Sequence, residues 1–192
     1  MSLISGLSRL DLAGLIAEAL CLKGIDVVLT GGSCVSIYSN EQYVSVDLDF
    51  IDISLKTNRQ IGVVLKSLGF ENKPINSRYF AHPDTQLTVE FPSAPLMIGD
   101  EFIPESQTEK MQTNQGTLKL LSPTDCVKDR LANFYYFHDK QCLEQALMVA
   151  SRHPINQSDL DKWHENENLK DEYVKFLTLI GTTNVKNKVT VR

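Results

Sequence analysis

The sequence predicts a fold of the α+β class, with an α/β domain over residues 1–121 followed by a helical region over residues 122–182. In the first part of the chain, short apolar segments typical of strands alternate with amphipathic segments typical of helices. From Ser122 onwards almost every segment has helical periodicity. The final residues, 183–192, are polar and basic, and we expect them to form a flexible tail.

Two amphipathic helices are expected in the α/β domain. The first covers residues 8–23, where Ser8 is a suitable N-cap residue because its hydroxyl can accept a bond from a free backbone amide. The second covers residues 57–70. It starts with Thr57 followed three residues later by Gln60, which is the pattern of a capping box.

The strands of this domain are expected to include two hairpins. A His-Pro-Asp-Thr turn separates the two segments of the first hairpin, and Asn-Gln-Gly separates those of the second. Three prolines, Pro92, Pro95 and Pro104, break the chain between the hairpins into loops. The predicted strands cover residues 25–30, 44–53, 77–82, 86–91, 109–113 and 117–122.

The helical region begins at a strong start signal. Ser122 is followed by proline at the first helical position and by Asp125 at the third, and both features favour a helix start. The first two helices are expected to meet near His138 and Asp139. The four predicted helices cover residues 123–137, 140–150, 157–167 and 169–180.

Bulk properties indicate an ordinary globular protein. Among 192 residues, 42% are hydrophobic and 22% are charged, so the chain can bury a core without disulfides. The net charge of −5 gives no strong signal for DNA binding. The four cysteines lack metal-site spacing, and no apolar run is long enough to span a membrane, so we expect a cytoplasmic protein that does not associate with membranes.

Two aspartates in the second predicted strand are the first candidate site residues. Side chains two positions apart on a strand face the same side, so Asp47 and Asp49 project together while Leu48 and Phe50 face the core. Two adjacent carboxylates repel each other unless a cation lies between them. The pair is therefore interpreted as a metal site, with a solvated strand surface as the alternative.

A glycine turn precedes these aspartates. Gly31, Gly32 and Ser33 follow the strand at residues 25–30 and precede a possible short helix. Glycine allows a tight turn and a close approach of backbone amides to a phosphate, and the start of a helix favours anions. The alternative is an ordinary strand-to-helix turn. The spacing matches neither a dinucleotide-binding fingerprint nor a P-loop.

A third acidic residue is available from a later strand. Glu90 lies between Val89 and Phe91, so it faces the opposite side of its strand from both. Metal-dependent phosphoryl transfer uses several carboxylates around the metal ions. Glu90 is therefore a third candidate ligand, although a strand glutamate more often faces solvent.

These motifs together resemble the polymerase-β-like nucleotidyltransferase superfamily, over roughly residues 10–150. The resemblance is carried by Gly31-Gly32-Ser33, Asp47-Leu48-Asp49 and Val89-Glu90-Phe91. The chain looks most similar to small bacterial members of abortive-infection and toxin–antitoxin systems. The resemblance implies a mixed β-sheet flanked by helices, followed by a C-terminal helical bundle.

The resemblance also implies roles for the candidate residues. Gly31, Gly32 and Ser33 would hold the phosphates of an NTP. Asp47, Asp49 and Glu90 would be the catalytic residues and the ligands of Mg²⁺, with two ions expected and Mn²⁺ as a substitute. Lys128 would contact the phosphates from the first helix of the helical region, with Arg130 as the second choice; a solvated helix face is the alternative for both.

The implied activity is transfer of an NMP from an NTP to a hydroxyl of a protein or RNA acceptor, with release of pyrophosphate. A cognate toxin or antitoxin protein is an expected partner. Two alternatives stay open at this point. One is a nucleotide-binding antitoxin or regulatory partner with little catalysis, and the other is a transferase acting on a small molecule such as an aminoglycoside.

Overall fold

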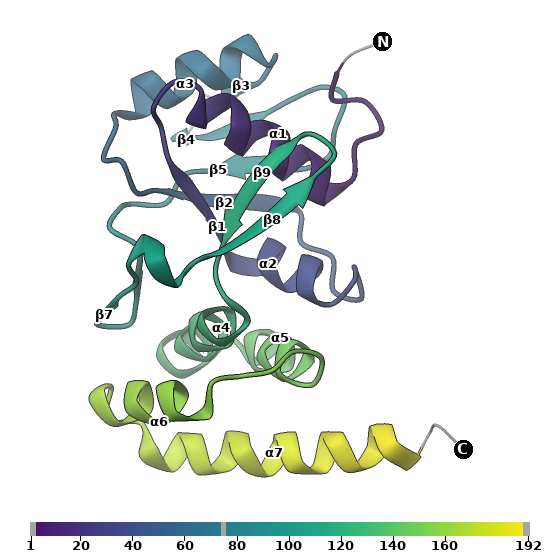
Figure 1. Ribbon diagram of the computed structural model, residues 1–192, viewed down its shortest axis with the longest axis vertical. Helices are drawn as coiled ribbons and strands as arrows, with labels where there is room; N and C mark the ends of the chain where they lie inside the picture. The colour runs from purple at the N-terminus through teal and green to yellow at the C-terminus, as the bar shows by residue number, and fades with distance from the viewer. Residues whose placement is uncertain (1–2, 74–75, 190–192) are drawn as a thin grey trace.

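The computed structural model describes residues 3–73 and 76–189. A mixed seven-stranded β-sheet with helices against it forms the upper part of the molecule, and a stack of helices forms the lower part (Figure 1). The strand order is β3 (Glu71–Lys73), β4 (Asn76–Ala81), β5 (Thr88–Glu90), β2 (Asp47–Asp52), β1 (Val27–Thr30), β9 (Gly116–Leu120) and β8 (Glu109–Thr113). The predicted α+β class and mixed sheet are confirmed.

The centre of the sheet brings together strands that are distant in the sequence. β1 runs antiparallel to β2 and parallel to β9, and β2 runs parallel to β5. The two predicted hairpins form as β4–β5 and β8–β9. The parallel β2–β5 pairing places the end of the first hairpin beside the aspartate strand.

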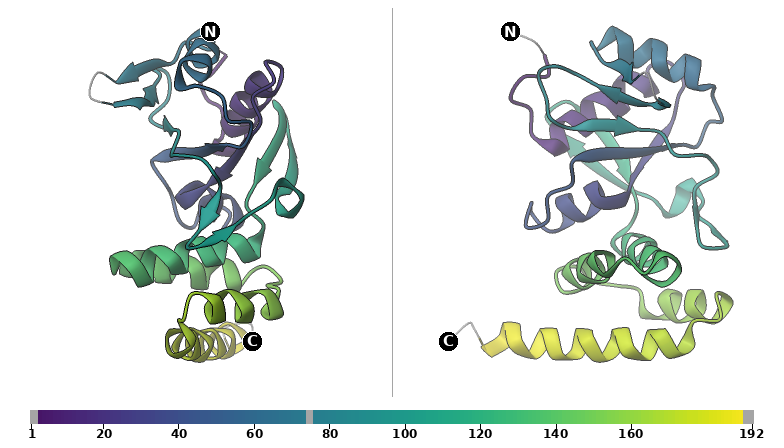
Figure 2. Two further views of the ribbon diagram at one scale, coloured as in Figure 1. Left: turned by 90° about the vertical axis from the view of Figure 1, so that its left-hand side faces the viewer. Right: turned by 180° about the vertical axis from the view of Figure 1, so that it is seen from behind.

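Helices α1 (Arg9–Cys21) and α3 (Asn58–Ser67) cover the sheet (Figure 2). The Ser8 hydroxyl accepts a bond from the Asp11 amide at the start of α1. Thr57 and Gln60 form the predicted capping box at the start of α3. Both predicted helices are therefore confirmed, with ends shifted by one to three residues.

Five elements of this domain were not predicted in their observed form. Helix α2 (Gly31–Tyr38) starts directly after β1, so the glycines lie in its first turn rather than in a separate loop. The short strand β3 extends the first hairpin to the edge of the sheet. Between β5 and β8, the proline-rich segment forms the two-stranded ribbon β6 (Met97–Ile98) and β7 (Glu101–Phe102) and the 3₁₀ turn η1 (Glu105–Gln107).

The helical region contains α4 (Pro123–Phe137), α5 (Lys140–Ala150), α6 (Gln157–Asn166) and α7 (Lys170–Val189). The Ser122 hydroxyl accepts a bond from the Asp125 amide, as the start signal predicts. α4 and α5 contact α2, and α6 and α7 lie beneath them (Figures 1 and 2). The side chain of Trp163 is buried and anchors α6, because its indole donates a bond to the Ile98 carbonyl.

The predicted flexible tail needs a correction. α7 continues to Val189, so residues 183–189 extend the last helix, and residues 190–192 lie outside the described part of the chain. The prediction of a flexible tail rested on the polar and basic composition of residues 183–192. Helical continuation needs no apolar face, because helix hydrogen bonds are internal to the segment.

The four cysteines are free thiols, as expected from their spacing. Within residues 3–73 and 76–189, none of the helices combines the length and the apolar character that a bilayer crossing requires.

Candidate active site

One row of residues crosses four strands at the centre of the sheet. Thr30 of β1 pairs with Asp49 of β2, Asp49 pairs with Glu90 of β5, and Glu90 pairs with Tyr79 of β4. Residues paired in register face the same side of a sheet. Asp47 lies two positions before Asp49 on this side. The structure thus gathers the three predicted carboxylate residues on one face.

The opposite face of these strands belongs to the core. Leu48, Phe50, Val89 and Phe91 are buried, whereas the acidic residues between them are half-buried. This burial pattern fixes the register, because a slip by one residue would turn the carboxylates into the core. The apolar neighbours therefore determine where the carboxylates point.

Gly31 lies directly against the Asp49 carboxylate. A Cβ atom at Gly31 would lie 2.2 Å from Asp49 Oδ2, and the φ angle of Gly31 is +66°. Both features exclude a side chain here. Thr30 provides no side-chain cap for α2, so the first amides of this helix remain available to an anion.

Ser33 is fully buried, and its hydroxyl serves the protein interior rather than a ligand. It donates a bond to the Asp47 carbonyl and accepts one from Arg9 Nη1 at 3.1 Å. Only the backbone amide of Ser33 remains for the predicted contact with a phosphate. The hydroxyl instead fixes the start of α2 to the start of β2.

Arg9 connects α1 to this arrangement and was not predicted. Its Nη2 donates to the Ser45 carbonyl at 2.8 Å, and its Nε pairs with Glu41 at 3.0 Å. The Ser45 hydroxyl in turn donates to Asp47 Oδ1 at 2.7 Å. Arg9 therefore connects the start of α2, which carries Ser33, to the segment before β2, which leads to Asp47. Nothing in the helical pattern of residues 8–23 distinguishes it from a surface arginine.

Gly32 is also confined by its neighbours. A Cβ atom there would lie 2.9 Å from Ser45 Oγ and 3.3 Å from Tyr43 Cε1. The ring of Tyr43 therefore covers this glycine. Burial raises the pKa of the Tyr43 phenol, the Arg130 charge opposes that rise, and Asp47 adds to it. Tyr43 is thus a neighbour of the site that the sequence did not indicate.

The Asp49 carboxyl has a strongly perturbed pKa. Burial, followed by the negative charges of Asp47 and Glu90, raises its pKa from 3.8 to about 7. Arg130 acts in the opposite direction but does not cancel the rise. Such a perturbation is typical of functional sites, where like charges are held together against their repulsion.

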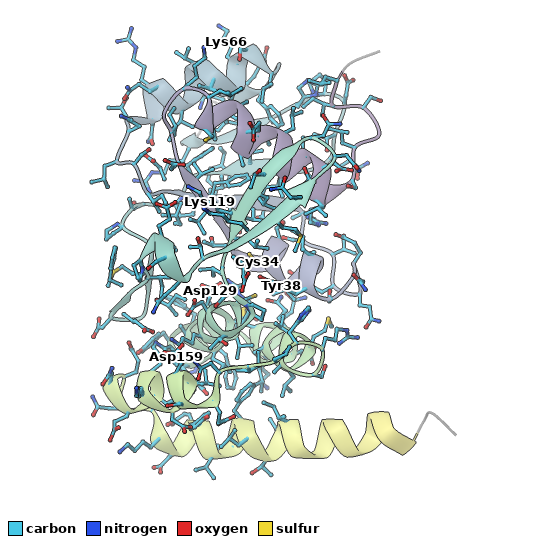
Figure 3. The ribbon with its side chains drawn as sticks, in the orientation of Figure 1. Cys34, Tyr38, Lys66, Lys119, Asp129 and Asp159 are labelled. Atoms are coloured by element: carbon cyan, nitrogen blue, oxygen red, sulfur yellow. The ribbon has the colours of Figure 1, made fainter. Side chains whose placement is uncertain are left out.

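A pocket of about 290 Å³ opens between this row and helix α4. Thr30, Gly31 and Asp49 line it from the sheet side, and Asp129, Arg130 and Asn133 line it from α4, where Figure 3 labels Asp129. Arg130 Nη2 pairs with Asp129 Oδ2 at 2.6 Å. Burial lowers the pKa of Arg130, but the Asp129 carboxylate outweighs it and the net shift is upward.

Lys128 does not line this pocket. Its ammonium group is buried among three carboxylates, at 2.9 Å from Glu101, 2.8 Å from Asp159 and 3.5 Å from Asp125. The prediction that Lys128 contacts the phosphates is therefore corrected. All three N–H donors of its ammonium group are occupied by carboxylates, so none remains for a phosphate. Arg130, the second choice, is the residue that α4 turns towards the site.

Tyr79 of the row and the pocket residues Asp129 and Asn133 were not among the site residues predicted from the sequence. Tyr79 is the register partner of Glu90, and interaction with the Glu90 carboxylate, followed by burial and the charges of Asp49 and Asp47, raises the pKa of the Tyr79 phenol. Asp129 and Asn133 are four positions apart, so they share one face of α4. The sequence shows this spacing, but it does not show that this face of α4 packs towards the start of α2 and Asp49.

The carboxylates fit a divalent cation in the type of donor and in their placement. Asp47, Asp49 and Glu90 supply the hard oxygen donors that Mg²⁺ prefers. The repulsion that raises the pKa of Asp49 is what a cation between these groups would relieve. Among residues 3–73 and 76–189, however, no three His, Cys, Asp or Glu side chains already converge on one metal position.

Comparisons with known proteins address the fold. No protein-family model matches the sequence, and no curated protein matches it. The structure is similar to that of an antigenic nucleotidyltransferase-like protein from Paracoccidioides brasiliensis, with a TM-score of 0.56, 14% identity and 76% of each chain covered. It also matches the solution structure of the antibiotic-resistance factor ANT(2'')-Ia, with a TM-score of 0.48, 12% identity and coverage of 88% of this chain and 92% of that one.

The first of these similarities covers three quarters of both chains. At 14% identity it concerns the backbone arrangement and not the residues of the site. The chain therefore has the fold of the nucleotidyltransferase-like proteins.

Proposed function

We propose that this protein is a Mg²⁺-dependent nucleotidyltransferase that transfers an NMP from an NTP to a hydroxyl of a protein or RNA acceptor. One observation carries the proposal. Asp47, Asp49 and Glu90 share a sheet face, and Asp49 lies against Gly31 at the uncapped start of α2. A carboxylate group beside free helix amides suits a metal-bound triphosphate.

The start of α2 would bind the phosphates. The backbone amides of Gly31, Gly32 and Ser33 lie in the first turn of the helix, where they have no partners within the helix. Glycine at the first two positions keeps side chains out of the space beside Asp49 and Ser45. Arg130 would add a positive charge from α4, on the far side of the pocket.

Asp47, Asp49 and Glu90 would hold the metal, with two Mg²⁺ ions expected and Mn²⁺ as a substitute. When bound, the metal would neutralise charge on the triphosphate and lower the pKa of the attacking hydroxyl. The Ser45 hydroxyl orients Asp47 by donating to Oδ1. The side chain of Asp47 therefore has a fixed orientation before any ligand arrives.

Glu90 would accept the proton of the acceptor hydroxyl. It lies at the edge of the carboxylate group, on the side of Asp49 away from Thr30 and α2. The acceptor oxygen would attack the α-phosphorus, and the bond to the β-phosphate would break to release pyrophosphate. A carboxylate that takes the proton at this step contributes typically 10²–10⁴-fold to the rate.

The proposed setting is a toxin–antitoxin or phage-defence system, which rests on the sequence resemblance alone. In such a setting the acceptor would be a macromolecule. The acidic net charge of −5 does not favour general binding to nucleic acid, so an RNA acceptor would need local contacts.

A second candidate function is nucleotide binding with little catalysis, as an antitoxin or regulatory partner. The observation in its favour is that the described carboxylates do not converge on one metal position as they stand. A protein of this kind would bind an NTP but release no pyrophosphate with any acceptor.

The first experiment measures binding of ATP, CTP, GTP and UTP with Mg²⁺ by isothermal titration calorimetry. The wild type is compared with the double variant Asp47→Asn/Asp49→Asn. Binding of at least one NTP by the wild type alone is expected. If no NTP binds, or if the double variant binds as well as the wild type, the proposal is wrong.

The second experiment follows pyrophosphate release in the presence of total RNA, cell lysate or aminoglycosides. Glu90→Gln should retain NTP binding and lose release by roughly 10²–10⁴-fold, as expected for loss of a general base. Release with aminoglycosides alone would favour a small-molecule acceptor. Binding without release in any condition would favour the regulatory alternative.

A further inference from the structure

Strand β8 forms one edge of the sheet. It pairs with β9 on one side, and on its other side no strand of the part of the chain that the structure describes pairs with it. In an antiparallel pair, every second residue turns its N–H and C=O groups away from the partner strand. The outer edge of β8 therefore presents backbone donors and acceptors to which a further strand can pair.

A groove of about 700 Å³ borders this edge, and we call it the β8 groove. Three consecutive residues of β8 line it: Glu109, Lys110 and Met111. Successive side chains of a strand point to opposite faces of the sheet, so three in a row line one cavity where that cavity borders the strand edge. The β8 groove therefore lies beside the unpaired backbone groups of β8.

The wall opposite β8 is built from helices. Leu10 of α1 and Ile37 and Tyr38 at the end of α2 line it, and α2 lies below β8 in Figure 1. His153, which follows α5, also lines the groove; its Nε2 donates to the Tyr38 carbonyl at 2.7 Å, and the two rings are 4.9 Å apart. The groove is thus formed before any ligand arrives.

Half-buried apolar side chains make up part of the lining. Leu10, Ile37, Met111 and Pro123 belong to this set. Removal of such surface from water is favourable, so the groove suits an apolar side chain of a ligand. Its volume is within the range of cavities that bind small ligands or peptide side chains.

The charged residues of the lining favour an acidic ligand. The Arg152 guanidinium donates to the Met148 carbonyl at 3.0 Å and to the side-chain oxygen of Gln42, and these acceptors are neutral. Neither Arg152 nor Lys110 forms an ion pair with any described residue. Glu109 is the one carboxylate among the lining residues, so the cations outnumber it.

We infer that the β8 groove binds an extended peptide segment of a partner protein. The segment adds a strand to the free edge of β8, places an apolar side chain between β8 and α2, and places an acidic side chain beside Arg152. In this kind of recognition, main-chain hydrogen bonds supply affinity and pockets for alternate side chains supply selectivity. The inference does not depend on the proposed function, because the β8 groove shares no lining residue with the pocket beside Asp49.

A peptide suits this edge better than a second copy of the chain does. An incoming strand has to enter between β8 and the wall formed by the end of α2 and the segment after α5. A single extended segment meets that requirement. The β8 edge of a second copy would bring the same wall with it.

The probe for the test is a synthetic peptide of alternating threonine and valine that contains one leucine and one glutamate and is capped at both ends. Isothermal titration without nucleotide should show that the wild type binds it. The same peptide methylated on consecutive backbone nitrogens should not bind, because neither of its edges can then pair with β8. Equal binding of both peptides, or no binding of the unmethylated one, overturns the inference.

Arg152→Glu tests the contact with the acidic side chain. It should weaken binding of the peptide by about 10-fold, as expected for loss of a charged hydrogen bond. Arg59→Glu is the matched control, because Arg59 is exposed on α3 and the change in net charge is the same. A peptide with lysine in place of glutamate should bind Arg152→Glu more tightly than it binds the wild type. Equal weakening in both variants, or no gain with the lysine peptide, contradicts the assignment.

Hydrogen exchange locates the bound peptide. The peptide should slow exchange of the β8 amides and leave those of β3, at the other edge of the sheet, unchanged. Slowed exchange at β3 in place of β8 overturns the inference. The free protein should sediment as a monomer; a dimer with protected β8 amides would place a second copy on this edge and would also overturn it.

Discussion

Asp49 and Glu90 are register partners on adjacent parallel strands, and their mutual repulsion is part of the folded state. The sheet holds them together because Leu48, Phe50 and Val89 on its other face are buried in the core. Apolar burial therefore offsets an unfavourable charge arrangement. This relationship has a measurable effect on stability.

Asp49→Asn should stabilise the folded protein, and the gain should depend on pH. The folded protein keeps the Asp49 proton up to about pH 7, whereas the unfolded chain releases it near 3.8. The folded state therefore becomes less stable as the pH rises from about 4 to 7. At pH 8 the variant should gain up to about 4 kcal/mol, at ~1.4 kcal/mol per pKa unit. Urea unfolding at pH 8 and pH 5 measures the difference.

The matched control for this comparison is Asp84→Asn, on an exposed loop. It should change the free energy of unfolding little at either pH. A gain for Asp49→Asn that is equal at pH 5 and pH 8 would contradict the charge explanation. Loss of NTP binding in the same variant is expected, so stability and function should change in opposite directions.

Gly31→Ala should abolish NTP binding through a clash with Asp49. The added Cβ would lie 2.2 Å from Asp49 Oδ2, so the carboxylate has to move. The φ angle of +66° adds backbone strain, for which Gly24→Ala is a matched control with a φ of +69° and no atom within 4 Å of the new Cβ. Each variant should lose about 1 kcal/mol or more of stability from strain. Calorimetry should show lost binding only for Gly31→Ala.

Lys128→Met should lower the stability of the protein and leave NTP binding unchanged, whereas Arg130→Met should weaken NTP binding. Removal of the buried Lys128 ammonium leaves three carboxylates without their cation, and a loss of roughly 3–5 kcal/mol is expected. NTP affinity of the remaining folded protein should be unchanged. Arg130→Met should weaken NTP binding by about 10-fold, as expected for loss of one charged contact. Weakened binding in Lys128→Met with unchanged stability would reverse the two assignments.

Much of the fold could be predicted because its signals are local. Caps at Ser8, Thr57 and Ser122 mark helix starts, and each of them forms the expected hydrogen bond. Alternation of apolar and acidic residues placed Asp47 and Asp49 on one face. The glycines were expected in a turn before a short helix because glycine is a poor helix former, but they form the first turn of α2, whose packing against β2 and α4 overrides that weakness.

The remaining parts of the site depend on contacts between distant segments. The parallel pairing of β2 with β5, which brings Glu90 to Asp49, follows from the whole strand order rather than from either strand. Lys128 and Arg130 are two positions apart on α4, so they point in different directions, and only the packed structure shows which one faces the site. For the same reason Arg9 had no local signal.

Arg9→Met should weaken both stability and NTP binding, because Arg9 positions the segments that carry Ser33 and Asp47. The variant leaves the Ser33 hydroxyl and the Ser45 carbonyl without their buried donor, and a loss of roughly 2–4 kcal/mol is expected. Glu41→Gln removes the charge of the half-exposed partner and should cost at most ~1 kcal/mol. Isothermal titration of Mg²⁺ and NTP at a temperature where both variants are folded separates an effect on the position of the binding residues from an effect on stability. A folded Arg9→Met protein that binds Mg²⁺ and NTP as tightly as Glu41→Gln would show that Arg9 only stabilises the fold.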